Sequence, residues 1–432
     1  MNRLIEFIEK NLLPVAGKIA SNKPLTAIRN AMMSMSPFFI IGSFFLLFAY
    51  LPIRGYDEFL NSIFGENVLQ NLLKTASTAT ISIMGLVILL SLAYHYAKIK
   101  ETDEIYAVMI SLMVFMILTP VVDGKLDLEW LGAKGMFIAI FIAFISTNAY
   151  IKIKSLNIEP KMPDTVPPAV SKSFAALFPI AIIAIVAVIV RGLFAMTRFG
   201  DIHNFVFTVV QAPLLALGTN VISLIVAEVI GQVLWFFGLH GNDIVGSVMR
   251  PIWQVMSAEN LEAFSAGLPQ ANIINEQMRN VFMLIGGSGS TLPLVLSLIF
   301  VTKSKHTKTL GALSLPAAIF NINEPIIFGL PIVLNPTLFI PWIITTPILG
   351  LITYYSMKIG LVAITNGIMI PWTTPVLISG YLVSGISGVI LQLVLCVVAF
   401  LIYYPFIKSI DNQMLKEETD NKMLKEEAII VN

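Results

Sequence analysis

The sequence is poor in charge and in cysteine. Charged residues make up 12% of the 432 residues, about half the roughly 25% typical of soluble domains. The 27 basic and 26 acidic residues nearly cancel, so attraction to nucleic acid has no electrostatic support. The single cysteine, Cys396, excludes an intrachain disulfide and a metal site built from several thiolates. We therefore expect no nucleic-acid partner, no metal and no cofactor.

Motifs for catalysis by the chain alone are also missing. The sequence has no phosphate-binding Gly-Lys-Ser/Thr run, and it has no G-x-S-x-G element that would present a nucleophilic serine. The N-terminus lacks the uninterrupted apolar core of a signal peptide. Residues 1–22 instead alternate charge and apolar residues at helical spacing. This pattern predicts an amphipathic helix that lies either on the membrane or on the protein itself.

Apolar residues, in contrast, make up 56% of the chain, in runs near the roughly 20 residues that cross a bilayer. The sequence predicts an all-α membrane protein with about ten transmembrane helices, two re-entrant hairpins and interfacial amphipathic helices. Clusters of lysine and arginine, including Lys303, Lys305 and Lys308, place both termini in the cytoplasm. The predicted spans are 31–52, 79–97, 105–122, 135–151, 174–196, 214–237, 281–301, 338–357 and 376–406.

Polar breaks interrupt the second half of this pattern. The first is W-F-F-G-L-H-G-N-D, at the end of an apolar run, which carries His240 between two glycines and Asn242 directly after the second. Charge counting across the spans requires an extra half-crossing here, so we predict a re-entrant hairpin near His240. Broken helices at membrane depth are tolerated where they are buried or line a cavity. Interrupted apolar segments are the pattern typical of transporter binding sites.

Three further breaks follow along the chain. The run G-G-S-G-S-T-L-P begins with Gly286, Gly287 and Ser288, whose small size allows close helix approach or exposes amides to a ligand. The run F-N-I-N-E-P carries Asn323 and Glu324, an acid that is costly in an apolar stretch unless it has a purpose. The segment 364–375 is small, polar and bounded by proline, with Trp372 near its end.

Some polar residues leave two interpretations open. Glu228, inside the predicted span 214–237, either acts directly or pairs with a neighbouring segment. His203 is expected at the surface. The proline-rich cytoplasmic loop around 157–172 is either a stiff linker or a docking site for a soluble partner.

The chemistry of these breaks suits a sugar. Carboxylates and amides bind hydroxyls, and tryptophan offers a large amphipathic face for stacking. The breaks are not rich in lysine or arginine, so a phosphate-bearing substrate is not expected. The residues alone leave open an ion-coupled secondary transporter for a sugar or another polar solute, with Glu324 carrying a proton or holding sodium.

The motifs F-G-L-H-G-N-D-I-V, M-R-P-I-W, I-G-G-S-G-S-T-L-P-L and F-N-I-N-E-P-I-I-F-G-L-P together resemble a known family. It is the membrane-spanning IIC permease component of the bacterial sugar phosphotransferase system, in the lactose/cellobiose/chitobiose branch. The resemblance covers nearly the whole chain. It implies a homodimer in the bacterial inner membrane. Residues 1–172 would form the scaffold, residues 173–408 the sugar-binding transport region, and residues 409–432 a cytoplasmic tail.

The resemblance also implies a division of labour. His240 and Glu324 would contact the sugar, with Glu324 near the hydroxyl that becomes phosphorylated; Asn242, Asn323, Trp372 and the glycines are plausible neighbours. A separate IIB subunit, recharged by IIA, would phosphorylate C6 of the sugar. Cys396 lies in an apolar run and cannot be the phosphocysteine, so the chain has no phosphorylation site of its own. A free-standing permease favours a β-linked disaccharide of the cellobiose or diacetylchitobiose type.

Overall fold

The computed structural model describes residue 18 and residues 21–50, 55–122, 124–156, 168–330 and 332–430. Most of the predicted N-terminal amphipathic helix and of the proline-rich loop lies outside these ranges. The described chain is almost entirely helical, which confirms the predicted all-α class. It forms two compact units, an N-terminal unit up to Leu217 and a C-terminal unit from Gly218. The functional division at residues 172 and 408 stays a prediction.

The N-terminal unit consists of helices and one short hairpin. Its elements are α3 (Lys23–Ala49), α4 (Tyr56–Phe64), α5 (Val68–Thr78), η2 (Ile81–Ile83), α6 (Met84–Ile99), α7 (Glu104–Leu118), β1 (Val121–Val122), β2 (Lys125–Leu126), η3 (Leu128–Leu131), η4 (Ala133–Gly135), α8 (Met136–Lys154), α9 (Pro168–Ala195), α10 (Ile202–Val206), the π-helical turn η5 (Phe207–Gln211) and α11 (Ala212–Gly218). The two strands pair antiparallel.

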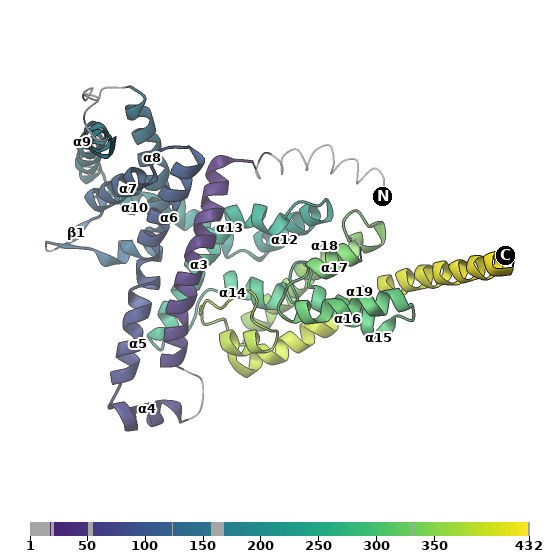
Figure 1. The fold of residues 1–432 in the computed structure, drawn as a ribbon. Helices are drawn as coiled ribbons and strands as arrows, with labels where there is room; N and C mark the ends of the chain where they lie inside the picture. The colour runs from purple at the N-terminus through teal and green to yellow at the C-terminus, as the bar shows by residue number, and fades with distance from the viewer. Residues whose placement is uncertain are drawn as a thin grey trace. The chain divides into compact units, whose positions relative to one another are not determined.

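Helix α6 is the centre of this unit, because α3, α7 and α8 all pack on it (Figure 1). One correction concerns His203 on α10, which the sequence placed at the surface. Its side chain is fully buried, with the rings of Phe115 and Trp130 packed edge-on against it. The polar neighbours Asp201 and Asn204 made this segment look exposed, although the aromatic side chains that cover it come from distant elements.

The C-terminal unit contains all four predicted breaks. Its elements are α12 (Val221–Phe236), α13 (Gly241–Ser265), α14 (Glu276–Met278), the π-helical turn η6 (Arg279–Met283), α15 (Thr291–Val301), α16 (Lys305–Ile319), α17 (Glu324–Gly329), α18 (Pro336–Lys358) and α19 (Ile378–Ile430), which is kinked at Ser384–Gly385. Each predicted break falls between two helices.

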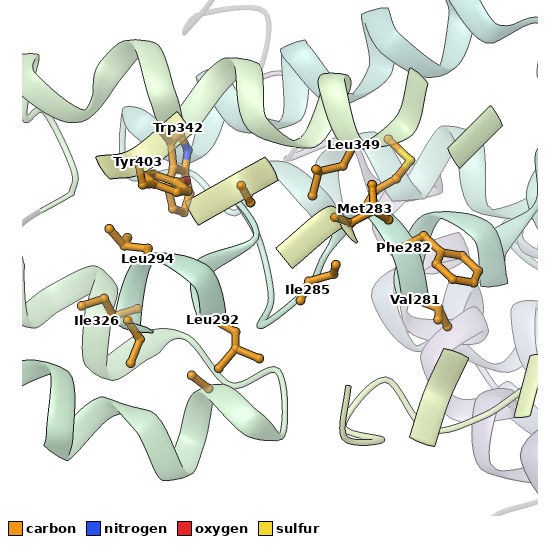
Figure 2. Close-up of a cluster of buried hydrophobic side chains, with 14 of the residues drawn as sticks. Val281, Phe282, Met283, Ile285, Leu292, Leu294, Ile326, Trp342, Leu349 and Tyr403 are labelled. Atoms are coloured by element: carbon orange, nitrogen blue, oxygen red, sulfur yellow. The ribbon is translucent and has the colours of Figure 1, made fainter. Parts of the chain in front are cut away.

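The core of the C-terminal unit surrounds one of these breaks. Figure 2 shows Met283 and Ile285 on the chain that enters the glycine-rich segment, and Leu292 and Leu294 on the chain that leaves it. Trp342 of α18 and Tyr403 of α19 complete the cluster. All six side chains are buried. The glycine-rich segment is therefore anchored by apolar packing on both sides, which keeps its backbone in a fixed place.

Five helices in the described part of the chain are long and apolar enough to cross a membrane, or six if a bent pair between residues 202 and 236 is one span. The five are Val68–Ile99, Ala133–Lys154, Ser173–Ala195, Pro336–Lys358 and Ile378–Lys416. All coincide with predicted spans, although the first begins at Val68 instead of residue 79. The count of about ten stays a prediction.

The C-terminal part of α19 is bonded to the residues just before α16. The buried carboxylate of Asp411 accepts hydrogen bonds from the backbone N–H groups of Lys303 and Ser304, at 2.8 and 2.9 Å. Glu418 accepts one from the Ser304 hydroxyl, which lowers the pKa of Glu418. The stabilisation from the Glu418 contact is therefore fully present above the ordinary glutamate pKa. It is lost as the pH falls through the lowered pKa of Glu418.

Replacing Asp411 by alanine is expected to lower the melting temperature, because it leaves two backbone N–H groups without their acceptor. An unsatisfied buried donor costs about 1–3 kcal/mol. Thermal unfolding in detergent measures the effect. Its exposed neighbour Asn412, changed to alanine, is the control. Equal melting temperatures for the two variants would show that Asp411 does not hold α16.

Candidate functional site

The glycine-rich break forms a tight turn between η6 and α15. Gly286, Gly287, Gly289 and Ser290 all have positive φ, from 54° to 97°. Such a run requires glycine at most positions, because other L-residues are strained there. At Gly286 a β-carbon would also stand 2.1 Å from the backbone nitrogen of Leu292. The glycines are therefore needed for the shape of the turn itself.

Two asparagines from other segments hold this turn at Ser288. Asn242, in the first turn of α13, donates from Nδ2 to the Ser288 hydroxyl at 2.5 Å. Asn323, which precedes α17, is buried and donates to the carbonyl of Ser288 at 3.0 Å. Predicted site residues from three separate breaks therefore meet at one serine.

A third asparagine, Asn321, links the turn to the fourth break. Its side-chain oxygen accepts a hydrogen bond from the Gly286 N–H at 2.8 Å. Its amide nitrogen donates to the carbonyls of Trp372 and Thr374 at 2.7 and 3.0 Å. Asn321 was not among the predicted site residues. Its place beside Asn323 in the same motif was the available signal, since a break with two amides has two groups to satisfy.

His240 stands at the entrance to α13. Its side chain is 55% exposed, and Nδ1 lies 3.0 Å from a carboxylate oxygen of Asp243. The ring packs on Trp235, with centroids 4.4 Å apart. Helices α12 and α13 meet closely here, because a β-carbon on Gly241 would stand 1.9 Å from the carbonyl oxygen of Gly231. His240 is thus oriented by an acid on one side and an aromatic ring on the other, while about half of its side chain stays exposed.

Glu324 and Trp372 lie at the ends of the segments that the asparagines hold. Glu324 begins α17, and its side chain is exposed. Its carboxylate is favoured at this helix N-terminus by the unpaired backbone N–H groups there. Trp372 is 62% exposed and lines a small hollow together with Asn321 and Thr374. These side chains offer an acceptor for hydroxyls and a flat face for a sugar ring.

A buried ion pair lies behind the site. Arg279 binds the carboxylate of Glu228 through Nε, and Nη2 donates to Oδ1 of Asn242 at 3.0 Å. Of the two roles left open for Glu228, the structure therefore supports the pairing with a neighbouring segment. Arg279 was missed by sequence reasoning. The available signal was Glu228 itself, since an acid in a buried span needs a cationic partner.

The chain is also similar to proteins that are already known. The chain matches the family model described as phosphotransferase system, EIIC, over residues 29–347. It is 44% identical to the cellobiose-specific EIIC component of Geobacillus stearothermophilus, covering 97% of this chain and 96% of that protein. It is 42% identical, with the same coverage, to the lichenan permease IIC component of Bacillus subtilis (strain 168).

A solved structure is also similar, the transporter ChbC, which is the IIC component of an N,N'-diacetylchitobiose-specific phosphotransferase system. It superposes with a TM-score of 0.93 at 43% identity, over 96% of this chain and 99% of that one. Together with the apolar helices, these matches identify a multi-pass membrane protein. The chain belongs to the EIIC family of the phosphotransferase system.

Proposed function

We propose that this protein is the permease component of a phosphoenolpyruvate-dependent phosphotransferase system that translocates a β-linked disaccharide of the cellobiose type, with diacetylchitobiose as the second candidate. The observation that carries the proposal is the glycine turn, bound by three asparagines from two other breaks, with His240, Glu324 and Trp372 around it. Similarity to relatives whose names specify cellobiose and diacetylchitobiose supports the choice of sugar.

Each exposed side chain has a role that its chemistry allows. Glu324 accepts hydrogen bonds from two adjacent sugar hydroxyls and lies near the one that is phosphorylated. His240 bonds a further hydroxyl, and its ring orientation is fixed by Asp243. Trp372 stacks against the apolar face of a sugar ring. The base of the proposed sugar site is polar and consists of Gly286, Gly287, Ser288, Asn242 and Asn323.

The proposal includes partners. A separate IIB subunit phosphorylates the C6 hydroxyl from the cytoplasm and is recharged by IIA. Two copies of the chain associate through the N-terminal spans. Three lysines, Lys303 just before α16 and Lys305 and Lys308 in its first turn, support a cytoplasmic location for this end of the C-terminal unit and for the tail that binds it.

Binding of cellobiose, diacetylchitobiose and lactose to the purified protein tests the substrate. We expect saturable binding of cellobiose or diacetylchitobiose, and weaker binding of lactose. Preferential binding of lactose would overturn the assignment to the cellobiose type. Binding of none of the three would overturn the proposed substrate class.

The energy source separates the proposal from an ion-coupled transporter. Uptake into vesicles that contain IIA, IIB and phosphoenolpyruvate is expected to yield phosphorylated sugar and to survive an ionophore. Uptake of unmodified sugar that the ionophore abolishes would favour the ion-coupled alternative.

A further inference from the structure

Arg279 is buried where three segments meet. It is 5% exposed and begins the π-helical turn η6, a local geometry that occurs often at functional sites. Its guanidinium lies 5.1 Å from the ring centroid of Trp253 on α13. The same group binds Glu228 on α12 and Asn242 at the start of α13. One side chain therefore fixes η6 against both α12 and α13, the helices on either side of His240.

The contact with Arg279 determines how the Asn242 amide is oriented. An arginine can only donate hydrogen bonds, so the oxygen of the amide must face Arg279 and the nitrogen must face Ser288. The Ser288 hydroxyl then accepts from Asn242 at 2.5 Å and keeps its own proton for donation. Without Arg279 the amide is free to rotate, and the hydroxyl would have no fixed direction.

The ion pair is poorly arranged as a stabilising element. Glu228 is 1% exposed, and its second carboxylate oxygen has no hydrogen-bond partner in the part of the chain that the structure describes. The same holds for both amide atoms of Gln232, one turn further along α12. A buried ion pair adds stability only when its geometry is excellent and its remaining atoms are satisfied. Protein groups in the described part of the chain therefore leave this pair only partly satisfied.

We propose that Arg279, held by Glu228, is a positioning residue for the sugar site: it sets the Asn242 amide and thereby the hydroxyl of Ser288 and the entrance of α13 at His240. This inference rests on the proposed function. It assigns no contact between Arg279 and the sugar. The pair acts through Asn242, so removing it should change affinity without unfolding the protein.

The test is the double variant Glu228→Leu with Arg279→Met, which replaces the pair by apolar side chains of similar size. Such replacements of buried ion pairs are often neutral or stabilising. We expect an unchanged or higher melting temperature and about tenfold weaker binding of the sugar that the wild type binds, the equivalent of one good hydrogen bond. Binding unchanged in the double variant would overturn the inference.

Two controls separate positioning from general damage. The single variant Arg279→Met leaves Glu228 buried and unpaired, so its melting temperature should fall below that of the double variant. The pair Lys154→Met with Asp103→Leu also removes one charge of each sign, from the ion pair that Lys154 at the end of α8 makes with Asp103 in the N-terminal unit. It should leave affinity within about twofold of the wild type. An equal loss of affinity in this control would also overturn the inference.

A readout without sugar keeps this test independent of the substrate assignment. Hydrogen exchange of the amides at 241–244 and 286–290 should be faster in the Glu228→Leu, Arg279→Met variant than in the wild type. If no disaccharide binds the wild type but this exchange increases, the substrate assignment fails while the positioning role stands. Unchanged exchange would overturn the positioning role by itself.

Discussion

Replacing Glu324 by glutamine is expected to weaken disaccharide binding by about 10- to 150-fold. The range corresponds to the loss of one hydrogen bond to a charged group, about 1.5–3 kcal/mol. The carboxylate can accept from two hydroxyls, whereas the amide has a single acceptor oxygen. Because Glu324 is exposed at the start of α17, the fold does not depend on its charge, and the melting temperature should stay the same.

Isothermal titration with the preferred sugar measures this effect. Glu262→Gln is the matched control, because it removes an exposed carboxylate from the same unit at the end of α13. Its affinity should equal that of the wild type. Unchanged affinity in the Glu324→Gln variant would show that the sugar does not contact this carboxylate and that the site lies elsewhere in the protein.

Replacing Gly286 by alanine is expected to cause the largest loss of stability among the substitutions considered, about 2–6 kcal/mol from backbone strain and overpacking together. The new β-carbon would meet the Leu292 backbone at 2.1 Å, and the residue would have to keep a φ of 83°. The segments on either side of the turn cannot shift to make room, because Met283 and Leu292 are packed in the core (Figure 2).

Thermal unfolding by fluorescence-detected gel filtration would measure the loss. Gly192→Ala in α9 is the control, since nothing lies within 4 Å of a β-carbon there. The control should be as stable as the wild type or slightly more so, because alanine favours helix. If the Gly286→Ala variant has the same melting temperature as the control, the turn is able to rearrange.

The breaks themselves were predictable because their causes are local. Glycine and proline interrupt a helix through their own backbone preferences, so the ends of α12 and α17 and the turn at 286–290 follow from neighbouring residues. The same holds for the spans, since length and apolar content are properties of a continuous segment. The sequence also predicts that these breaks carry polar groups, because the polar residues are part of the breaks themselves.

The contacts between breaks were not predictable, because they join residues far apart in the sequence. Arg279 and Glu228 are 51 residues apart, and Asn321 reaches Trp372 across a similar distance. A single sequence shows that a buried acid needs a partner, but it does not show which residue that partner is. His203 shows the reverse error, since its polar neighbours suggested exposure while distant aromatic residues bury it.

Most hydrogen bonds that hold the glycine turn around Ser288 go to main-chain groups. Asn321 and Asn323 use the N–H of Gly286 and the carbonyls of Ser288, Trp372 and Thr374. Main-chain groups are present whatever side chain a residue carries. A substitution at position 372 or 374 is therefore expected to leave these hydrogen bonds in place.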